Sequence, residues 1–147
     1  MNFYEYLENR AKDDGIGKIV VGAVITNDND EILLMKRKED DFMGGIFEIP
    51  GGNAEDGEGI YEVLEREIKE ETNFDLKRVI SYINYFDYLS GSGKKSRQFN
   101  FKVEVTGGPI ILTEHDTYGW VNLDEIETQN VSDAVKESLI IYRFNEK

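Results

Sequence analysis

Stretches with the hydrophobic pattern of β-strands occupy much of the chain. Residues 18–26 and 31–38 are rich in β-branched and other apolar side chains, and the turn-forming sequence Asn-Asp-Asn-Asp separates them. This pattern predicts two strands. Residues 77–89 and 96–105 flank the flexible, basic sequence Ser-Gly-Ser-Gly-Lys-Lys and predict a long hairpin. Residues 118–123 predict one further strand.

Apolar residues recur at helical spacing near both ends of the chain. Near the N-terminus they predict a short amphipathic helix or a docked arm, and near the C-terminus they predict a helix that Ser132 caps. The residues of these two patterns are Phe3, Leu7 and Ala11, and then Val135, Leu139 and Tyr142. Strands and helices alternate irregularly around one core, which favours a mixed α/β sandwich.

The sequence Pro50-Gly51-Gly52 follows a short apolar run. Proline cannot donate a hydrogen bond to a strand ladder, and consecutive glycines permit backbone angles that other residues avoid. We therefore expect these three residues to end a short strand.

The size and composition of the chain are those of one globular domain. The 147 residues suffice for a single core, so we expect one domain over residues 1–147. The chain is 39% hydrophobic and 32% charged with 2 prolines, which fits neither a disordered nor a fibrous protein. No apolar run approaches the roughly 20 residues of a bilayer span, and the acidic N-terminus lacks the layout of a signal peptide. We expect a cytoplasmic protein without a membrane partner.

The charge and the cysteine content narrow the chemistry. Acidic residues number 30 against 17 basic ones, and the net charge of -13 would repel the backbone of a large nucleic acid. Such a charge serves solubility or concentrates divalent cations, and composition alone does not separate the two. The absence of cysteine excludes disulfides, thiolate zinc sites and a cysteine nucleophile. Any metal must bind to oxygen or to the single histidine.

Acidic side chains interrupt the apolar stripe of a helix predicted to begin near residue 60. Glu67 and Glu71 fall inside the stripe and Glu70 falls at its edge, because these residues stand at positions i, i+4 and i+3. The apolar members of the stripe are Ile60, Val63, Leu64 and Ile68. Burying ionised carboxylates together is costly, so basic residues, shared protons or hard cations such as Mg²⁺ must neutralise them. A solvated acidic face is the alternative, and the apolar stripe argues against it.

Residues 52–74 read GNAEDGEGIYEVLEREIKEETNF. This segment resembles the Nudix box, in which glycine, five residues, glutamate, seven residues, Arg-Glu, an aliphatic residue, any residue, Glu-Glu, any residue, glycine and an aliphatic residue follow in order. The matching residues are Gly52, Glu58, Arg66, Glu67, Ile68, Glu70, Glu71 and Phe74. Asn73 stands where the family has glycine. Asparagine also tolerates a positive φ, so we expect the turn to be kept.

The resemblance implies an α/β/α sandwich with a central mixed β-sheet and a helix that holds Mg²⁺, or Mn²⁺ in its place, against a diphosphate. In the family's terms, the catalytic residues are Glu67, Glu70, Glu71 and Arg66, and Glu67 orients or deprotonates the attacking water. The three glutamates and the carbonyl group of Gly52 would hold the metal. Arg66 would hold a glutamate in place.

The remaining residues of the motif are expected to be structural. Glu58 would pair with a basic residue at the start of the helix, and Gly51 and Asn73 would shape the turns. A further metal ligand often comes from the loop before a tryptophan-containing strand, and Glu114, six positions ahead of Trp120, is the candidate.

The function implied by the resemblance is hydrolysis of a nucleoside diphosphate linked to another group. A compact chain is most similar to the MutT-like nucleoside triphosphate pyrophosphohydrolases, including those that remove oxidised nucleotides. Hydrolysis of ADP-ribose or of a dinucleoside polyphosphate, a non-catalytic nucleotide-binding regulatory domain and a metal-binding helix module stay open as alternatives. The partner in the favoured interpretation is a small nucleotide.

Several residues outside the motif have two interpretations. Arg37 and Arg97 either contact substrate phosphates or lie on the solvated surface. Aromatic residues of the strands stack on a base or belong to the core, and these are Phe42, Phe47, Tyr85 and Tyr88. His115 is a base or a hydrogen-bonding loop residue. The N-terminal segment is a candidate element for a homodimer.

Overall fold

The strands of the protein form two sheets in a computed structural model that describes residues 1–38, 45–113 and 115–145. The larger sheet is mixed and has the order β4-β1-β6-β5. In it, β1 (Lys18–Val24) pairs in parallel with β6 (Lys95–Gly107) and antiparallel with β4 (Gly51–Asn53). The antiparallel partner of β6 is β5 (Phe74–Leu89), which confirms the long hairpin.

The smaller sheet is antiparallel and has the order β3-β2-β7. Its strands are β2 (Ile32–Arg37), β3 (Phe47–Glu48) and β7 (His115–Val121). The first two strands of the chain thus lie in different sheets, and an isolated bridge between Thr26 and Ile32 lies at the connection between them. The strand predicted at residues 118–123 begins three residues earlier, at His115.

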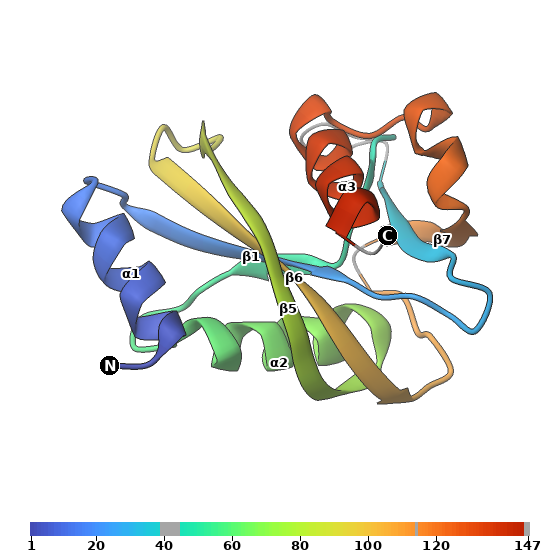
Figure 1. The fold of residues 1–147 in the computed structure, drawn as a ribbon, viewed down its shortest axis with the longest axis horizontal. Coiled ribbons are helices and arrows are strands. Elements are labelled where there is room, and N and C mark those ends of the chain that lie inside the picture. The colour runs from blue at the N-terminus through green and yellow to red at the C-terminus, as the bar shows by residue number, and fades with distance from the viewer. Residues whose placement is uncertain (39–44, 114, 146–147) are drawn as a thin grey trace.

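Two helices cover opposite faces of the mixed sheet. Figure 1 shows α2 (Ile60–Thr72) on one face and α3 (Asp133–Asn145) on the other. A short 3-10 helix, η1 (Leu123–Thr128), precedes α3. The main-chain N–H of Val135 donates to the Ser132 hydroxyl (3.3 Å), which confirms Ser132 as the predicted cap. This arrangement confirms the predicted mixed α/β fold.

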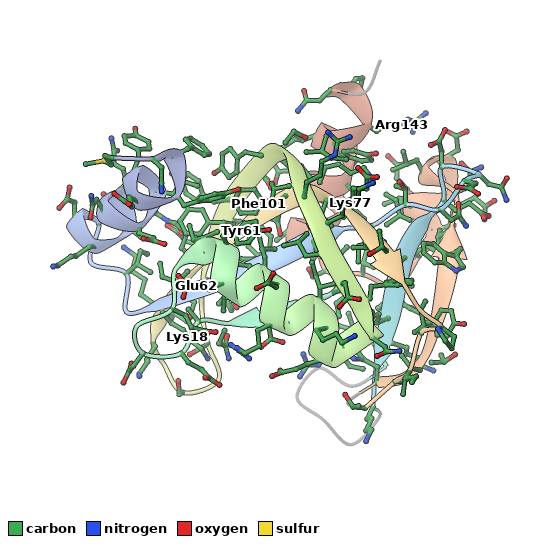
Figure 2. All side chains as sticks on the ribbon, turned by 90° about the horizontal axis from the view of Figure 1, so that it is seen from below. Lys18, Tyr61, Glu62, Lys77, Phe101 and Arg143 are labelled. Atoms are coloured by element: carbon green, nitrogen blue, oxygen red, sulfur yellow. The ribbon has the colours of Figure 1, made fainter. Side chains whose placement is uncertain are left out.

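The N-terminal helix α1 (Phe3–Asp13) packs against the start of α2. The ring of Tyr4 lies 6.2 Å from that of Tyr61 and 5.9 Å from that of Phe101, in the region labelled in Figure 2. A Glu8 carboxylate oxygen accepts a hydrogen bond from the N–H of Ile60 (2.8 Å). Glu8 thereby satisfies one of the free N–H groups at the start of α2, where the N-cap residue Gly59 has no side chain.

Strand β1 contributes to both halves of the core because successive side chains point to opposite faces. Val21 and Ala23 belong to the cluster under α1 and α2, and Val24 belongs to the cluster under α3. The apolar stripe of α2 is buried as predicted, and the helix ends at Thr72 with Asn73 as its C-cap residue, whose φ is 71°. The substitution of asparagine for the family's glycine therefore keeps the left-handed turn. No helix among the described residues combines the length and the apolar character that a membrane span requires.

The short strand ends before Pro50-Gly51-Gly52 as predicted, but the two glycines do not adopt the unusual backbone angles expected of them. Strand β3 ends at Glu48, but Gly51 and Gly52 then begin β4 and pair with β1. Neither glycine has a positive φ. They are needed for close approach, since a Cβ at Gly51 would overlap the carbonyl oxygen of Val21.

We predict that Gly51→Ala lowers the free energy of unfolding by about 1–3 kcal/mol or more, because β4 must move away from β1 to admit a methyl group. Urea unfolding followed by circular dichroism would measure the change. The matched control is Gly91→Ala at the hairpin tip, where a Cβ would meet no atom within 4 Å. Equal stability of the two variants would contradict the close approach.

Candidate active site

Carboxylates of α2 line a pocket of about 410 Å³ where this helix meets β4 and the start of β7. We call it the glutamate pocket. Glu71 is 5% exposed, and the side chain of Glu67 is 13% exposed. The Glu70 side chain is 57% exposed and lies at the rim. These positions match the predicted placement of two glutamates within the apolar stripe and one at its edge.

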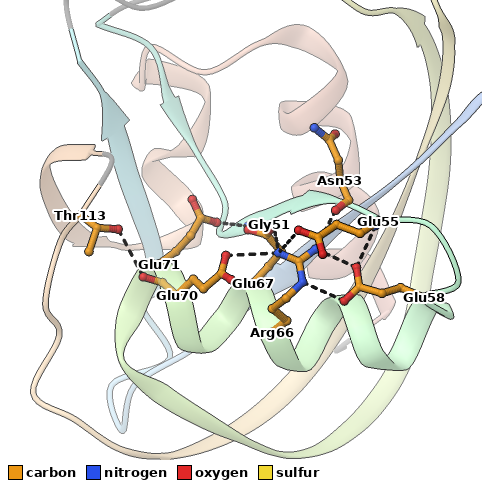
Figure 3. Close-up of polar contacts among 9 residues, drawn as sticks. All are labelled: Gly51, Asn53, Glu55, Glu58, Arg66, Glu67, Glu70, Glu71 and Thr113. Carbon is orange, nitrogen blue, oxygen red and sulfur yellow. Dashed lines mark hydrogen bonds and ion pairs between the residues drawn. The ribbon is translucent and has the colours of Figure 1, made fainter.

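The guanidinium of Arg66 organises these carboxylates (Figure 3). Its Nε and Nη2 atoms donate to the two oxygens of Glu58, at 2.7 and 2.8 Å. Its Nη1 atom donates to Glu67 (2.9 Å) and to Glu70 (3.2 Å), and Nη2 also donates to the main-chain carbonyl of Asn53 (2.9 Å). Arg66 therefore joins the loop before α2 to two of the glutamates.

Electrostatics keep this pair ionised. Hydrogen bonds from Arg66 lower the pKa of Glu58 from 4.5 to about 2, and the N–H of Glu55 adds to this effect. The same contact raises the pKa of Arg66 above its ordinary value. One guanidinium faces the carboxylates of Glu58, Glu67 and Glu70, so negative charge remains in excess at the pocket.

Main-chain atoms of β4 complete the wall of the pocket. The N–H of Gly51 donates to a carboxylate oxygen of Glu71 (2.6 Å), a short, charge-assisted hydrogen bond. A Cβ at Gly52 would overlap the carboxylate of Glu67. The absence of side chains at both positions thus lets the backbone of β4 lie against the glutamates.

The donor chemistry of the pocket fits a hard divalent cation. Carboxylate and peptide oxygens are the ligands that Mg²⁺ prefers, and Glu67, Glu71 and the main chain of Gly52 bring them together. In the part of the chain that the structure describes, no three His, Asp or Glu side chains already surround a common point. Arg66 instead holds the oxygens of Glu67 and Glu70, so a bound cation would share these two carboxylates with the guanidinium.

His115 and Glu48 extend the pocket on the side of the smaller sheet. The side chain of His115 is 6% exposed, with Nδ1 at 3.5 Å from Glu71 and Nε2 at 3.5 Å from Glu48. Glu48 accepts two hydrogen bonds from Arg37 Nη1, at 3.0 and 3.2 Å. Glu48 is not among the residues predicted from the sequence, although it stands in the Glu-Ile-Pro-Gly-Gly sequence that leads into the motif.

Comparison with known proteins identifies the family. The model described as the NUDIX domain matches residues 18–140. The chain belongs to the Nudix family. Helix α1 lies outside the matched segment, and one domain over the whole chain remains a prediction.

Nudix proteins of known structure and of curated function resemble the chain. The MutT protein from Methanosarcina mazei Go1 is 26% identical, with a TM-score of 0.78 over 88% of this chain and 96% of that one. The 8-oxo-dGTP diphosphatase of Buchnera aphidicola is 26% identical over 76% of this chain and 82% of its own length. The 8-oxo-dGDP phosphatase NUDT18 of Danio rerio is 31% identical over 64% of this chain. The chain spans 22% to 31% of the length of three curated relatives, the Danio protein among them.

The two arginines predicted outside the Nudix motif lie in different places. Arg37 lines the glutamate pocket, as a phosphate contact would require. Arg97 is absent from its lining. It is buried between Asp87 (2.7 Å) and Asp14 (2.9 Å), and its guanidinium carbon lies 4.3 Å from the centre of the Tyr85 ring. The alternation of side chains along β6 turns Arg97 to the face opposite Gln98, which does line the pocket.

The aromatic residues predicted to stack on a base also lie in different places. Phe47 and Tyr88 line a second pocket, described below, whereas Tyr85 lies against Arg97. Glu114 and Phe42 lie outside the described residues. The hydroxyl of Thr113, next to Glu114 in sequence, donates to the main-chain carbonyl of Glu70 (3.3 Å).

A second pocket of about 500 Å³ adjoins the glutamate pocket. The two pockets share a wall that includes Arg37, Glu48, Tyr88, Gln98 and Val135. The rest of the second pocket is mainly apolar and includes Phe47 from β3 and Phe86 from β5. Burial raises the pKa of Tyr88, and the nearby carboxylate of Glu48 adds to the effect.

We predict that Glu58→Gln removes a pH-dependent part of the stability. The pKa of Glu58 is about 2 in the folded protein and near 4.5 when unperturbed, so its ionisation favours folding. This contribution is fully present above about pH 4.5 and is lost as the pH falls through about 2. The difference in unfolding free energy between wild type and Glu58→Gln should therefore shrink between these limits.

Urea unfolding at a series of pH values would measure this difference. Glu127→Gln is the matched control, because Glu127 is an exposed glutamate of η1. A difference that stays constant from neutral pH to pH 3 would contradict the role assigned to the Arg66–Glu58 pair.

Proposed function

We propose that the chain is a divalent-cation-dependent pyrophosphohydrolase that converts a nucleoside triphosphate, oxidised forms included, to a nucleoside monophosphate and pyrophosphate. The observation that carries this proposal is the convergence of Glu67, Glu70 and Glu71 on a pocket whose other wall is the glycine backbone of β4. Family membership and the named activities of the Buchnera and Danio relatives support it.

The metal would be Mg²⁺, with Mn²⁺ as a substitute, held by the three glutamates and the carbonyl of Gly52. When bound, it neutralises phosphate charge, lowers the pKa of water and stabilises the leaving group. We propose Glu114 as a further ligand.

The protein groups position the reactants and move the proton. Glu67 orients the attacking water and accepts its proton as the new bond to phosphorus forms and the anhydride P–O bond breaks. Arg66 fixes Glu67 and Glu70 through hydrogen bonds of 2.9 and 3.2 Å. The N–H of Gly51 fixes Glu71, and Arg37, which lines the pocket, would contact a substrate phosphate.

Other substrates with the same diphosphate core define the alternatives. ADP-ribose and dinucleoside polyphosphates present the same anhydride to the glutamates and a second group to the adjoining pocket. A non-catalytic nucleotide-binding domain would not need three glutamates held in one pocket. The predicted homodimer and cytoplasmic location remain predictions, which light scattering and cell fractionation would test.

The test is product analysis after incubation with Mg²⁺ and a panel of substrates. The panel contains canonical and oxidised nucleoside triphosphates, ADP-ribose and a dinucleoside polyphosphate, and ion-exchange chromatography separates the products. We expect Glu70→Gln to lower kcat/KM by about a hundredfold or more, because it removes a charged ligand from the site.

Glu65→Gln is the matched control, because this substitution removes the same charge from the exposed face of α2. It should keep wild-type activity. Full activity of Glu70→Gln would refute the metal assignment. Nucleotide binding without turnover of any substrate would favour the regulatory domain.

A further inference from the structure

A chain of polar side chains runs through the core from α3 to the pockets. Asn100 and Ser138 are both 0% exposed. The Nδ2 atom of Asn100 donates to the Ser138 hydroxyl (3.2 Å) and to Oδ1 of Asn84 (3.1 Å). The Nε2 atom of Gln98 donates to Oδ1 of Asn100 (2.8 Å). Polar networks in a core are costly unless satisfied, and the proposed hydrolysis assigns no role to this one.

Gly22 of β1 makes room for this amide chain. A Cβ at Gly22 would lie 2.7 Å from Nε2 of Gln98 and would overlap Oδ1 of Asn100. The network therefore depends on a position without a side chain in the neighbouring strand.

The direction of the hydrogen bonds fixes the orientation of the Gln98 amide. The single hydroxyl proton of Ser138 goes to the main-chain carbonyl of Ala134 (3.0 Å), so the Ser138 oxygen accepts from Asn100. Asn100 must then turn its NH₂ group towards Ser138 and its carbonyl towards Gln98. An N–H group of Gln98 donates a hydrogen bond to this carbonyl.

One edge of the Gln98 amide is left for a ligand. Two acceptors repel each other, so the carbonyl oxygen of Gln98 is disfavoured beside Oδ1 of Asn100. From this repulsion we infer that the N–H used in the network is the one directed away from the Gln98 carbonyl. The carbonyl and the second N–H form an edge with an acceptor beside a donor, on a residue that lines both pockets.

The second pocket has the character of a site for a flat aromatic group. Phe47, Phe86 and Tyr88 offer ring surfaces on which a base can stack. The pocket shares a wall with the glutamate pocket, so a nucleotide whose phosphates bind the glutamates can place its base there. Gln98 stands in the shared wall.

Resting on the proposed function, we propose that Gln98 determines base specificity and favours adenine over guanine nucleotides. Adenine presents a 6-amino donor beside the N7 acceptor, which pairs with the amide of glutamine through two hydrogen bonds. Guanine presents two acceptors, O6 and N7, on the same edge and would oppose the carbonyl of Gln98 there. The preference for adenine therefore requires that the base enter with its N7 edge towards Gln98, because the N1–H and O6 edge of guanine would pair with the amide.

The test measures binding of the adenosine and guanosine 5′-(α,β-imido)triphosphates by calorimetry with Mg²⁺. Wild-type protein should bind the adenosine compound about tenfold more tightly or better, as a bidentate pair allows. Gln98→Met, which keeps the length of the side chain, should bring the two dissociation constants within about twofold of each other. Binding of Mg²⁺-imidodiphosphate, which lacks a base, should not change.

Two further variants separate specificity from structural damage. Ser138→Ala removes an acceptor of Asn100 from α3, where alanine favours the helix, and should reduce the preference for adenine in part. Gln129→Met makes the same change at the chain's other glutamine and should leave the preference intact.

A preference for guanine, equal binding of the two compounds by wild type, or equal weakening of both by Gln98→Met would overturn the inference. Adenine-selective binding without hydrolysis of any nucleotide would overturn the proposed function alone. Hydrolysis without base preference would overturn this inference alone.

Discussion

The two-pronged contact between Arg66 and Glu58 is the interaction on which the site depends. Helix α2 carries Glu67, Glu70 and Glu71 within its last two turns, where the helix dipole disfavours negative charge. Repulsion among these groups adds to that cost. Arg66 lies within the same helix, is anchored on Glu58 at 2.7 and 2.8 Å, and extends its third nitrogen to two of the glutamates. The excess of negative charge that remains favours the binding of a cation in the proposed site.

The mixed sheet supplies the second half of this constraint. Glutamates on a helix can face a metal only if the opposite wall is close and has oxygen or N–H groups to offer. Strand β4 provides that wall because Gly51 and Gly52 have no side chains, so its backbone lies against both β1 and α2. The N–H of Gly51 reaches Glu71 at 2.6 Å as a result. The two glycines are thus part of the site through their main chain.

Local pattern was enough to predict α2 and the placement of its glutamates, because a helix fixes the direction of every side chain from spacing alone. The position of the Arg97 side chain could not be predicted from local pattern. Its ion-pair partners, Asp14 at the end of α1 and Asp87 on β5, are distant from each other in the sequence, so no local spacing shows that they meet at Arg97. The contact between Glu48 and His115 could not be predicted for a similar reason. They stand on strands that meet only across β2, and no spacing in the sequence shows that contact.

The proposed division of labour assigns chemistry and specificity to different elements. Helix α2 and β4 hold the groups that act on phosphates, whereas Gln98 on β6 takes its orientation from Asn100 and, through it, from Ser138 on α3. In this proposal, base selectivity depends on a buried network of β6 and α3, apart from the elements that carry the glutamates and the glycine wall. A change on α3 can then alter which base is accepted while the carboxylates, Arg66 and the glycine wall stay in place. The same hydrolytic site can in this way serve different nucleotides through substitutions made in the core on the opposite face of the sheet.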